Sequence, residues 1–276
     1  MPDLFARTEL LLGSEAMRVL EASHGAVFGL GGVGGYAAEA LARAGIGALT
    51  LVDHDRVSPT NVNRQIVALQ STIGLYKADV MAQRVADINP SCKVTALKCF
   101  YLPDTADSID LGQFNYVIDA VDTVTAKLLL IERCQQIGTP LVSSMGTANK
   151  LDPTALRVGD IYGTSICPLA KIIRKECRKR GVKHLKVVYS EEPALQPSAQ
   201  AQEAYRAKIA AEAQADTPHR DAAPVNLDKF GRAGIPGSVS FVPPAAGLVL
   251  AGGVVKELVS KTIMDSNADY SIDRTS

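Results

Sequence analysis

The stretch "GAVFGLGGVGGYAAEALARAGIGALTLVD", residues 25–53, decides the fold of this chain. An apolar run leads into a glycine-rich turn, an amphipathic helical pattern, a glycine and a second apolar run, which together predict one βαβ unit. Glycines let the backbone approach a phosphate, and the N-terminus of the following helix presents unpaired N–H groups. The turn therefore predicts a nucleotide site with Asp53 at the offset of a ribose-binding acid, unless it serves only tight packing. Its glycines are Gly29, Gly31, Gly32 and Gly34.

Strand and helix patterns alternate on both sides of this unit. Residues 5–22 predict two short helices around Gly13. Further along, helices are expected over 75–90 and 124–137, and strands over 93–101, 116–122 and 139–146. This alternation predicts an α/β protein with a Rossmann-like, doubly wound, mostly parallel sheet and helices on both faces.

The pattern changes after residue 150. Residues 171–186 contain eight Lys or Arg against one Glu, and residues 191–229 are rich in Ala, Gln, Glu and Pro, with one helix expected around 200–214. From residue 237 a strand, the break Pro243-Pro244 and a core helix are expected. We therefore expect a single domain, 1–276, with a nucleotide-binding core (1–150), a basic and flexible insertion (151–236) and a returning strand and helix (237–276).

The composition excludes several classes of protein. The 276 residues include 29 basic and 29 acidic side chains, so any nucleic-acid surface must be a local cluster. The uncharged stretch 233–255 is interrupted by prolines and too short beyond them to span a bilayer, so we expect no membrane association. Five cysteines without a CxxC pair argue against a structural zinc site or a disulfide framework and suit the cytoplasm; they are Cys92, Cys99, Cys134, Cys167 and Cys177.

The segment "DHDRVSPTNVNRQ", residues 53–65, and the residues after it favour ATP over NAD. A triphosphate carries more charge than a dinucleotide's pyrophosphate, and reaction at its α-phosphate needs cations to absorb charge as pyrophosphate leaves. The Arg64 guanidinium can bind two phosphate oxygens at once, and Lys77 can place a single positive charge near the α-phosphate. Asp122, at the carboxyl end of a strand, can bind Mg²⁺ through its carboxylate. Taken singly, each has a plain alternative, since Arg64 and Lys77 suit a surface and Asp122 a helix cap.

Five separated motifs follow one another along the chain: "RTELLLG", the glycine turn, "LVDHDRVSPTNVNRQ", "GLYKAD" and "DAVDT". In this order they resemble the HesA/MoeB/ThiF superfamily of ubiquitin-activating-enzyme-like adenylyltransferases over residues 7–150. The resemblance implies ATP contacts at Gly32, Asp53, Asn61, Arg64, Lys77 and Asp122, with Asp55, Asn63 and the other glycines of the turn in the same site. It also implies a homodimer in which Arg7 reaches the partner's phosphates, so that Arg7, Arg64, Lys77 and Asp122 are the expected catalytic residues.

The second half, with "SSMGTANKLDPTALRVGDIYG" and "IPGSVSFVPPAAGLVLAGGVVKEL", resembles the tRNA threonylcarbamoyladenosine dehydratases of this superfamily, although residues 191–229 match poorly. The resemblance implies adenylation of the carboxylate on a modified tRNA adenosine, followed by internal ring closure. No catalytic cysteine is then needed, and Cys167 is expected to be a core or loop residue. Three alternatives remain: an adenylyltransferase for a ubiquitin-like sulfur carrier, an NAD(P)-dependent oxidoreductase, and an ATP-binding module without catalysis.

The basic run predicts where tRNA would bind. Lys and Arg neutralise phosphates without reading sequence, and helical spacing would gather several on one face. A solvated helix face is the alternative. The predicted tRNA-binding residues are Lys171, Arg174, Lys175, Arg178, Lys179 and Arg180.

Overall fold

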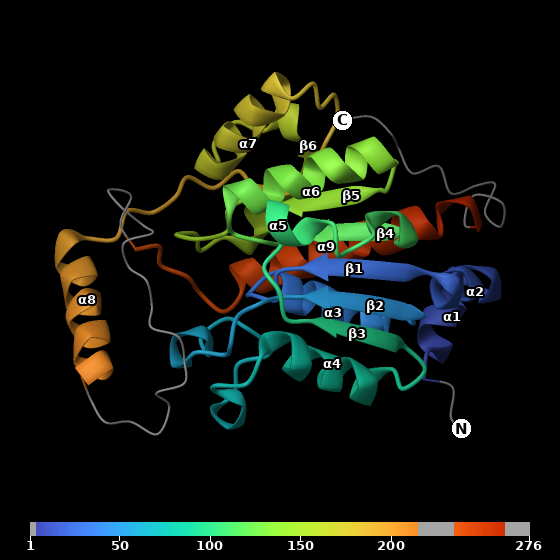
Figure 1. Cartoon of the computed structure of the whole chain (residues 1–276), viewed down its shortest axis with the longest axis horizontal. Coiled ribbons are helices and arrows are strands. Elements are labelled where there is room, and N and C mark those ends of the chain that lie inside the picture. The colour runs from blue at the N-terminus through green and yellow to red at the C-terminus, as the bar shows by residue number, and fades with distance from the viewer. Residues whose placement is uncertain (1–3, 215–234, 263–276) are drawn as a thin grey trace.

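The computed structural model describes residues 4–214 and 235–262. Its centre is a seven-stranded sheet in the order β3-β2-β1-β4-β5-β7-β6 (Figure 1). All neighbouring strands are parallel except β6, which runs antiparallel to β7 at one edge. The mostly parallel sheet predicted from the sequence is confirmed. The strands are β1 His24–Phe28, β2 Ala48–Val52, β3 Lys93–Leu97, β4 Tyr116–Asp119, β5 Leu141–Ser144, β6 Leu156–Asp160 and β7 Lys186–Ser190.

Helices cover both faces of the sheet because the strands bury side chains on both. In β1, Val27 packs into one apolar cluster with α3, α4 and α9, while Ala26 and Phe28 pack into another with α6. Such strands read as continuous apolar runs. The helices are α1 Ala6–Leu12, α2 Ser14–Ala22, α3 Gly34–Arg43, α4 Lys77–Ile88, α5 Pro103–Ala106, α6 Val124–Ile137, α7 Pro168–Lys179, α8 Ala199–Gln214 and α9 Val242–Leu258.

The predicted strand before Pro243 is absent, and residues 235–241 form an irregular segment instead. Pro243 and Pro244 do not break the chain before the last helix but lie in the first turn of α9. Proline is tolerated there because the first N–H groups of a helix have no intrahelical partner. The part of the predicted return that covers residues 263–276 lies outside the described residues.

The small residues of α9 pack within the chain. Gly247 faces α3, and a Cβ at this position would lie 2.3 Å from the carbonyl oxygen of Val33. The close approach that this glycine permits therefore joins α9 to α3. Among the described residues, no helix combines the length and apolar character needed to cross a membrane.

The segment predicted as an insertion, 151–236, contributes to the main sheet. β6 and β7 extend the sheet beyond β5, and the basic helix α7 packs on α6 through Ile173 and Cys177. The predicted helix around 200–214 is present as α8. The rest of the segment expected to be flexible, 215–229, lies outside the described residues.

Candidate functional site

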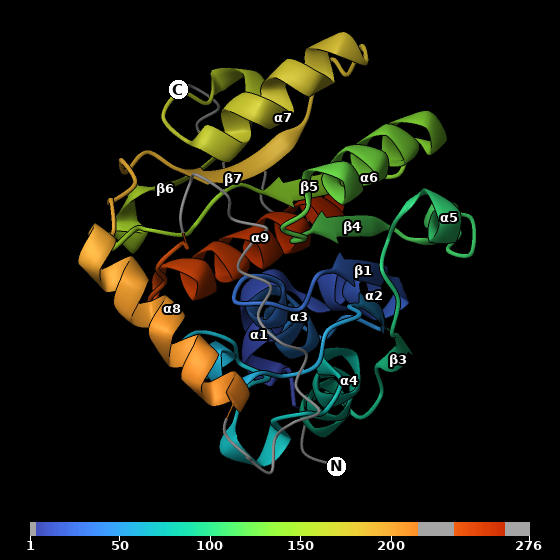
Figure 2. The same ribbon diagram turned by 60° about the vertical axis from the view of Figure 1, so that its left-hand side comes forward.

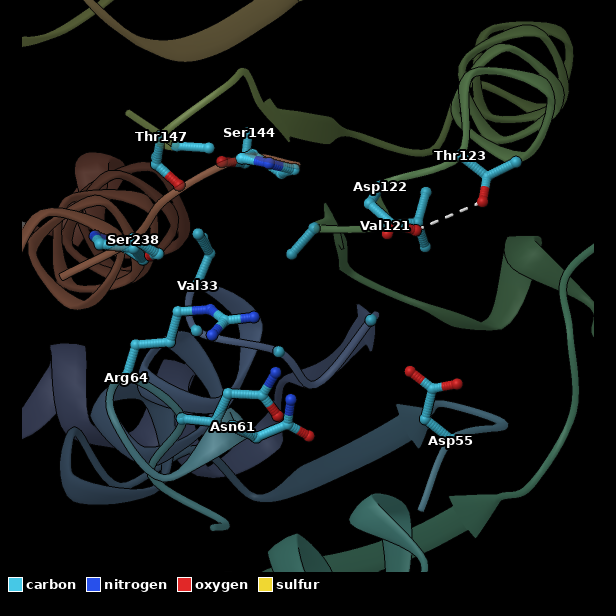
Figure 3. Close-up of a pocket in the computed structure, with 18 of the residues that line it drawn as sticks. Val33, Asp55, Asn61, Arg64, Val121, Asp122, Thr123, Ser144, Thr147 and Ser238 are labelled. Atoms are coloured by element: carbon cyan, nitrogen blue, oxygen red, sulfur yellow. Dashed lines mark hydrogen bonds between the residues drawn. The ribbon is translucent and has the colours of Figure 1, made fainter. Parts of the chain in front are cut away.

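A cavity of about 1000 Å³ opens at the carboxyl ends of the parallel strands. Ligands of open α/β sheets bind at this edge. Figure 3 shows Asn61 and Arg64 on one side of the cavity, Asp55 and Asp122 at two further positions, and Thr147 with Ser238 opposite Asp55. Residues from the loops after β1, β2, β4 and β5 therefore meet in one place.

The glycine turn between β1 and α3 is shaped by contact with the loop after β4. Gly29 has a φ of +85°, and a Cβ there would lie 2.7 Å from the carbonyl oxygen of Ala120. A Cβ on Gly34 would lie 1.8 Å from the carbonyl oxygen of Gly29. Gly29, Gly31 and Gly32 line the cavity, whereas Gly34 lies behind the turn as the first residue of α3. The turn thus combines the tight packing and the access that a phosphate site requires.

Two acidic residues follow β2 and occupy different environments. The Asp53 carboxylate is buried and accepts hydrogen bonds from the backbone N–H of Leu30 at 2.6 Å and of Asp55 at 2.8 Å. Burial raises the pKa of Asp53, opposed by Lys77 and by these N–H groups. Asp55 accepts a hydrogen bond from Lys77 Nζ at 2.7 Å and lies 3.0 Å from His54 Nε2. The hydrogen bond from His54 and the charge of Lys77 hold the pKa of Asp55 well below its usual range.

Asn61 and Arg64 lie on the loop after β2. Asn61 Oδ1 accepts the backbone N–H of Ser58 at 3.1 Å, which fixes the short 3₁₀ turn Pro59–Asn61. The Arg64 guanidinium donates to Thr60 O at 3.1 Å and to Asn63 Oδ1 at 2.8 Å. Burial lowers the pKa of Arg64, with nearby Tyr205 acting in the opposite direction. A half-buried guanidinium held in the cavity is suited to an anionic ligand.

Asp122 follows β4 and accepts a hydrogen bond from Thr123 Oγ1 at 3.3 Å (Figure 3). Below it lies a fully buried ion pair, with Lys127 Nζ 3.0 Å from Asp119 Oδ2. Ser143 Oγ donates to the same oxygen at 2.5 Å, while Asp119 Oδ1 accepts the backbone N–H of Val121 at 3.2 Å. This network anchors the loop that carries Asp122, and it was not found in the sequence because charged residues in apolar runs give no pairing signal.

A second group of possible metal ligands adjoins the turn. Side-chain donor atoms of Asp53, His54 and Asp55 lie within 4.8 Å of one another. Both Asp53 oxygens already accept backbone hydrogen bonds, and Lys77 places an ammonium on Asp55. This donor set does not suit a divalent cation, so Asp122 remains the better metal ligand of the two candidates.

Arg7 and the six predicted tRNA-binding residues are not among the residues that line the cavity. Arg7 is exposed on α1. Of the six predicted tRNA-binding side chains, on α7 and directly after it, four already have partners within the chain. Arg174 donates to Thr164, Lys179 and Arg180 pair with Glu176, and Arg178 lies over the ring of Tyr162. Lys171 and Lys175 are exposed.

Sequence reasoning missed two parts of the lining. Cys99, Phe100 and Tyr101 follow β3, and Phe100 stacks on His54 with ring centroids 3.5 Å apart. Because they follow the carboxyl end of a parallel strand, these residues could have been expected at the ligand-binding edge of the sheet. Residues 144–148, part of α8 and the segment 235–238 form the other missed part. Nothing in the local sequence of α8 signals a place beside the nucleotide turn.

Cys167 is a core residue, as predicted. It is 1% exposed and packs with Met145, Ile161 and Ala170. All five cysteines are free thiols, and only Cys99 lines the cavity.

A parallel sheet with a phosphate-type glycine turn, an arginine, a lysine and acidic residues at its carboxyl edge defines a nucleotide-binding α/β protein of the adenylating class. The chain belongs to the ThiF family, which matches residues 5–268. It is 43% identical over 256 residues to the tRNA threonylcarbamoyladenosine dehydratase of Bacillus subtilis (strain 168), covering 92% of this chain and 94% of the relative.

A solved structure is similar over nearly the whole chain. It is the E. coli tRNA N6-threonylcarbamoyladenosine dehydratase TcdA in complex with AMP, with a TM-score of 0.76, 34% identity and 94% of both chains covered. The E. coli protein has also been solved with ATP. By contrast, the adenylyltransferase and sulfurtransferase MOCS3 of Drosophila sechellia is 35% identical over 152 residues, which is 55% of this chain and 31% of that protein. The family resemblance inferred from the motifs is confirmed.

Proposed function

We propose that this chain adenylates the carboxylate of threonylcarbamoyladenosine in tRNA with ATP and then closes that group into a ring with loss of water. The proposal of adenylation rests on one observation: Arg64, Lys77 and Asp122 line the same cavity as the glycine turn. The choice of tRNA as substrate is supported by the similarity to a dehydratase across 92% of the chain, where the sulfur-carrier type of enzyme matches 55%.

The phosphates of ATP lie against the glycine turn in this proposal. The backbone at Gly31 and Gly32 approaches them, Arg64 forks onto the terminal oxygens, and Lys77 directs its charge at the α-phosphate. Asp53 binds the ribose through the lone pairs left free by its two backbone hydrogen bonds. Asp55 holds Lys77 in position. Asn61 and Asn63 fix the loop that carries Arg64.

Mg²⁺ fits at Asp122, where it would neutralise charge shared between the phosphates. The substrate carboxylate attacks the α-phosphorus, a P–O bond forms, and the bond to the β-phosphate breaks to release pyrophosphate. Arg64 and Lys77 absorb the charge that develops on the leaving group.

Ring closure follows within the substrate. A nucleophile of the threonylcarbamoyl group attacks the activated acyl carbon, and AMP leaves with the electron pair of the acyl–oxygen bond. Because the two groups are already joined, proximity replaces an enzyme nucleophile. The burial of Cys167 away from solvent agrees with a mechanism that needs no thiolate.

The proposed enzyme is a homodimer. Arg7 lies outside its own chain's cavity, so it acts only if it reaches a partner. Leu10 and Leu11 on the same helix are 89% and 82% exposed, which provides apolar surface for a second copy. A cytoplasmic location agrees with five unpaired cysteines.

We propose that tRNA binds at the surface of α7, mainly through two of the six residues predicted from the sequence. Lys171 and Lys175 are exposed one turn apart on α7, whose first turn contributes Leu169 to the cavity lining. The other four predicted side chains hold intramolecular partners and would have to exchange them. We therefore expect Lys171 and Lys175 to contribute most to the salt-dependent part of binding.

The test is nucleoside analysis of tRNA bearing threonylcarbamoyladenosine after incubation with the protein, ATP and Mg²⁺. The modified nucleoside should become lighter by one water, with one pyrophosphate and one AMP released per ring, and omission of ATP should prevent the change. Unchanged tRNA, together with ATP-dependent adenylation of a sulfur-carrier C-terminus, would replace this proposal by the sulfur-carrier alternative.

A further inference from the structure

The cavity has a second wall, which the proposed contacts to ATP do not use. One side consists of the glycine turn and the loops after β2 and β3. The opposite side consists of residues 144–148, the first turns of α8 and residues 235–238. Figures 1 and 2 show α8 along the end of the molecule to which β1 and β2 point. Small-molecule cavities are typically about 300–1,000 Å³, so this one, at about 1000 Å³, is large for a nucleotide alone.

This wall is tied to the core by an unusual asparagine. Asn149 is the one non-glycine residue with positive φ in the described chain, at 60°. Its backbone N–H donates to Gly237 O at 2.9 Å and its Oδ1 accepts the N–H of Gly237 at 2.6 Å. Its carbonyl accepts the N–H of Leu195 at 2.8 Å. One residue therefore fixes both the segment that leads into α8 and the segment that leads into α9.

The helix itself is also fixed. Ser198 Oγ accepts the N–H of Ala201 at 3.1 Å and caps α8, and Gln202 Oε1 accepts the N–H of Ile235 at 3.0 Å. On the far side, Asn63 Nδ2 donates to Ser238 O at 3.1 Å, which joins this wall to the loop of Arg64. The wall is thus part of the site and held at a set distance from the phosphate-binding cations.

The side chains that face inward suit a nucleoside. Tyr205 and Gln202 are half-buried, one turn apart, and both line the cavity. Aromatic rings stack on bases that have left a helix, and amide groups hydrogen-bond base edges or carbonyl oxygens. Gln202 Oε1 accepts the N–H of Ile235, and the NH₂ group of the same amide supplies two donors for a ligand.

We propose that α8 and residues 235–238 form the wall of the cavity that receives the modified adenosine, and that Tyr205 and Gln202 determine specificity for it. This inference rests on the proposed function. Tyr205 stacks on the substrate base, and Gln202 donates to a carbonyl of the group attached to that base. In this arrangement both side chains contact the substrate and not ATP, although Tyr205 lies near Arg64.

The experiment compares Tyr205→Leu and Gln202→Ala with Glu203→Ala, an exposed change on the same helix outside the lining. Two quantities are measured on the full-length protein: the Kd for ATP by calorimetry, and the KM for modified tRNA from pyrophosphate release. Loss of a stacked base typically weakens binding about tenfold or more. We expect KM for tRNA to rise by about that factor in Tyr205→Leu and by about three- to tenfold in Gln202→Ala, which loses a hydrogen bond. The Kd for ATP of both variants, and both quantities for Glu203→Ala, should stay within about twofold of wild type.

Free threonylcarbamoyladenosine serves as a second probe, because it carries the base without the tRNA backbone. It should inhibit the wild type in competition with tRNA, and inhibition should weaken in Tyr205→Leu while Tyr205→Phe keeps it. If Tyr205→Leu fails to fold, Gln202→Ala and Tyr205→Phe decide the question. A raised Kd for ATP with unchanged KM for tRNA, or no change in either, overturns the inference. A wild-type protein without activity on modified tRNA refutes the proposed function instead.

Discussion

Replacing Lys127 by Met should destabilise the protein strongly, because it leaves a buried carboxylate without its cation. Lys127 is 1% exposed and Asp119 is not exposed at all, and they lie 3.0 Å apart. Methionine matches the apolar stem of lysine, so the change removes charge and little volume. Breaking such a pair by removing one partner typically costs about 3–5 kcal/mol. For a domain of this size that corresponds to a fall in Tm of roughly 6–20 °C.

Denaturant unfolding followed by circular dichroism measures the free energy, with the m-value as a check on two-state behaviour. Lys171→Met is the matched control, since Lys171 is exposed on α7, and should change stability by less than about 0.5 kcal/mol. The double variant Lys127→Met with Asp119→Asn removes both charges and should recover about 1–3 kcal/mol of the loss. A cost below about 1 kcal/mol for Lys127→Met, or no recovery in the double variant, would show that the pair is not buried as described.

The remaining predictions concern the site. Arg64→Ala should lower the rate of adenylation by about a hundredfold, equivalent to about 3 kcal/mol, in a protein that unfolds like the wild type; a rate near wild type in single-turnover assays would remove Arg64 from the phosphate site. Mixing Arg7→Ala with Lys77→Ala protein should restore part of the activity, because one site of each heterodimer is intact, and an active monomer in sedimentation would contradict this. Cys99 should be alkylated slowly and be protected by ATP, because it lines the cavity; Cys134, where burial raises the pKa to about 12, should not react in the folded protein. Mass mapping of the modified thiols separates these outcomes. Modification of Cys99 at the same rate with saturating ATP would place the nucleotide elsewhere.

Local sequence predicted the part of the fold in which neighbouring residues determine the structure. The helix 124–137 and the βαβ unit at the glycine turn were placed from periodicity and glycine alone. The strand expected before Pro243 was wrong, because an apolar run beside prolines suits the buried start of a helix as well as a strand. The sheet extends to β6 and β7, although this basic segment was expected to form an insertion. The two strands were missed because their apolar alternation is short and the helix between them is strongly charged.

For the site, the sequence singled out residues of the glycine turn and of the loop after β2 that line the cavity, and it did not single out the lining residues of α8. Arg64 and Lys77 were singled out by their charge close after the glycine turn, and Asn61 by the resemblance to the family. Tyr205 and Gln202 come to the cavity because Asn149 accepts the N–H of Leu195 ahead of α8, a pairing of residues far apart in sequence. A single sequence carries no record of such a pairing. The basic run was likewise identified by composition, and only the structure separates its paired side chains from Lys171 and Lys175.

The packing of α9 on α3 has a consequence for how the chain folds during synthesis. The face of α3 near Ala37 is covered by Gly247 of α9. This face of α3 therefore stays uncovered during synthesis until α9 has been made. About 200 residues separate the end of α3 from the start of α9, and at roughly 5–20 residues per second the ribosome needs about 10–40 seconds to supply them. During that interval the nucleotide turn has strands and a helix but lacks its outer cover. ATP-binding competence should therefore appear late in translation, after release of α9, and nascent chains that stop before residue 242 should depend on chaperones.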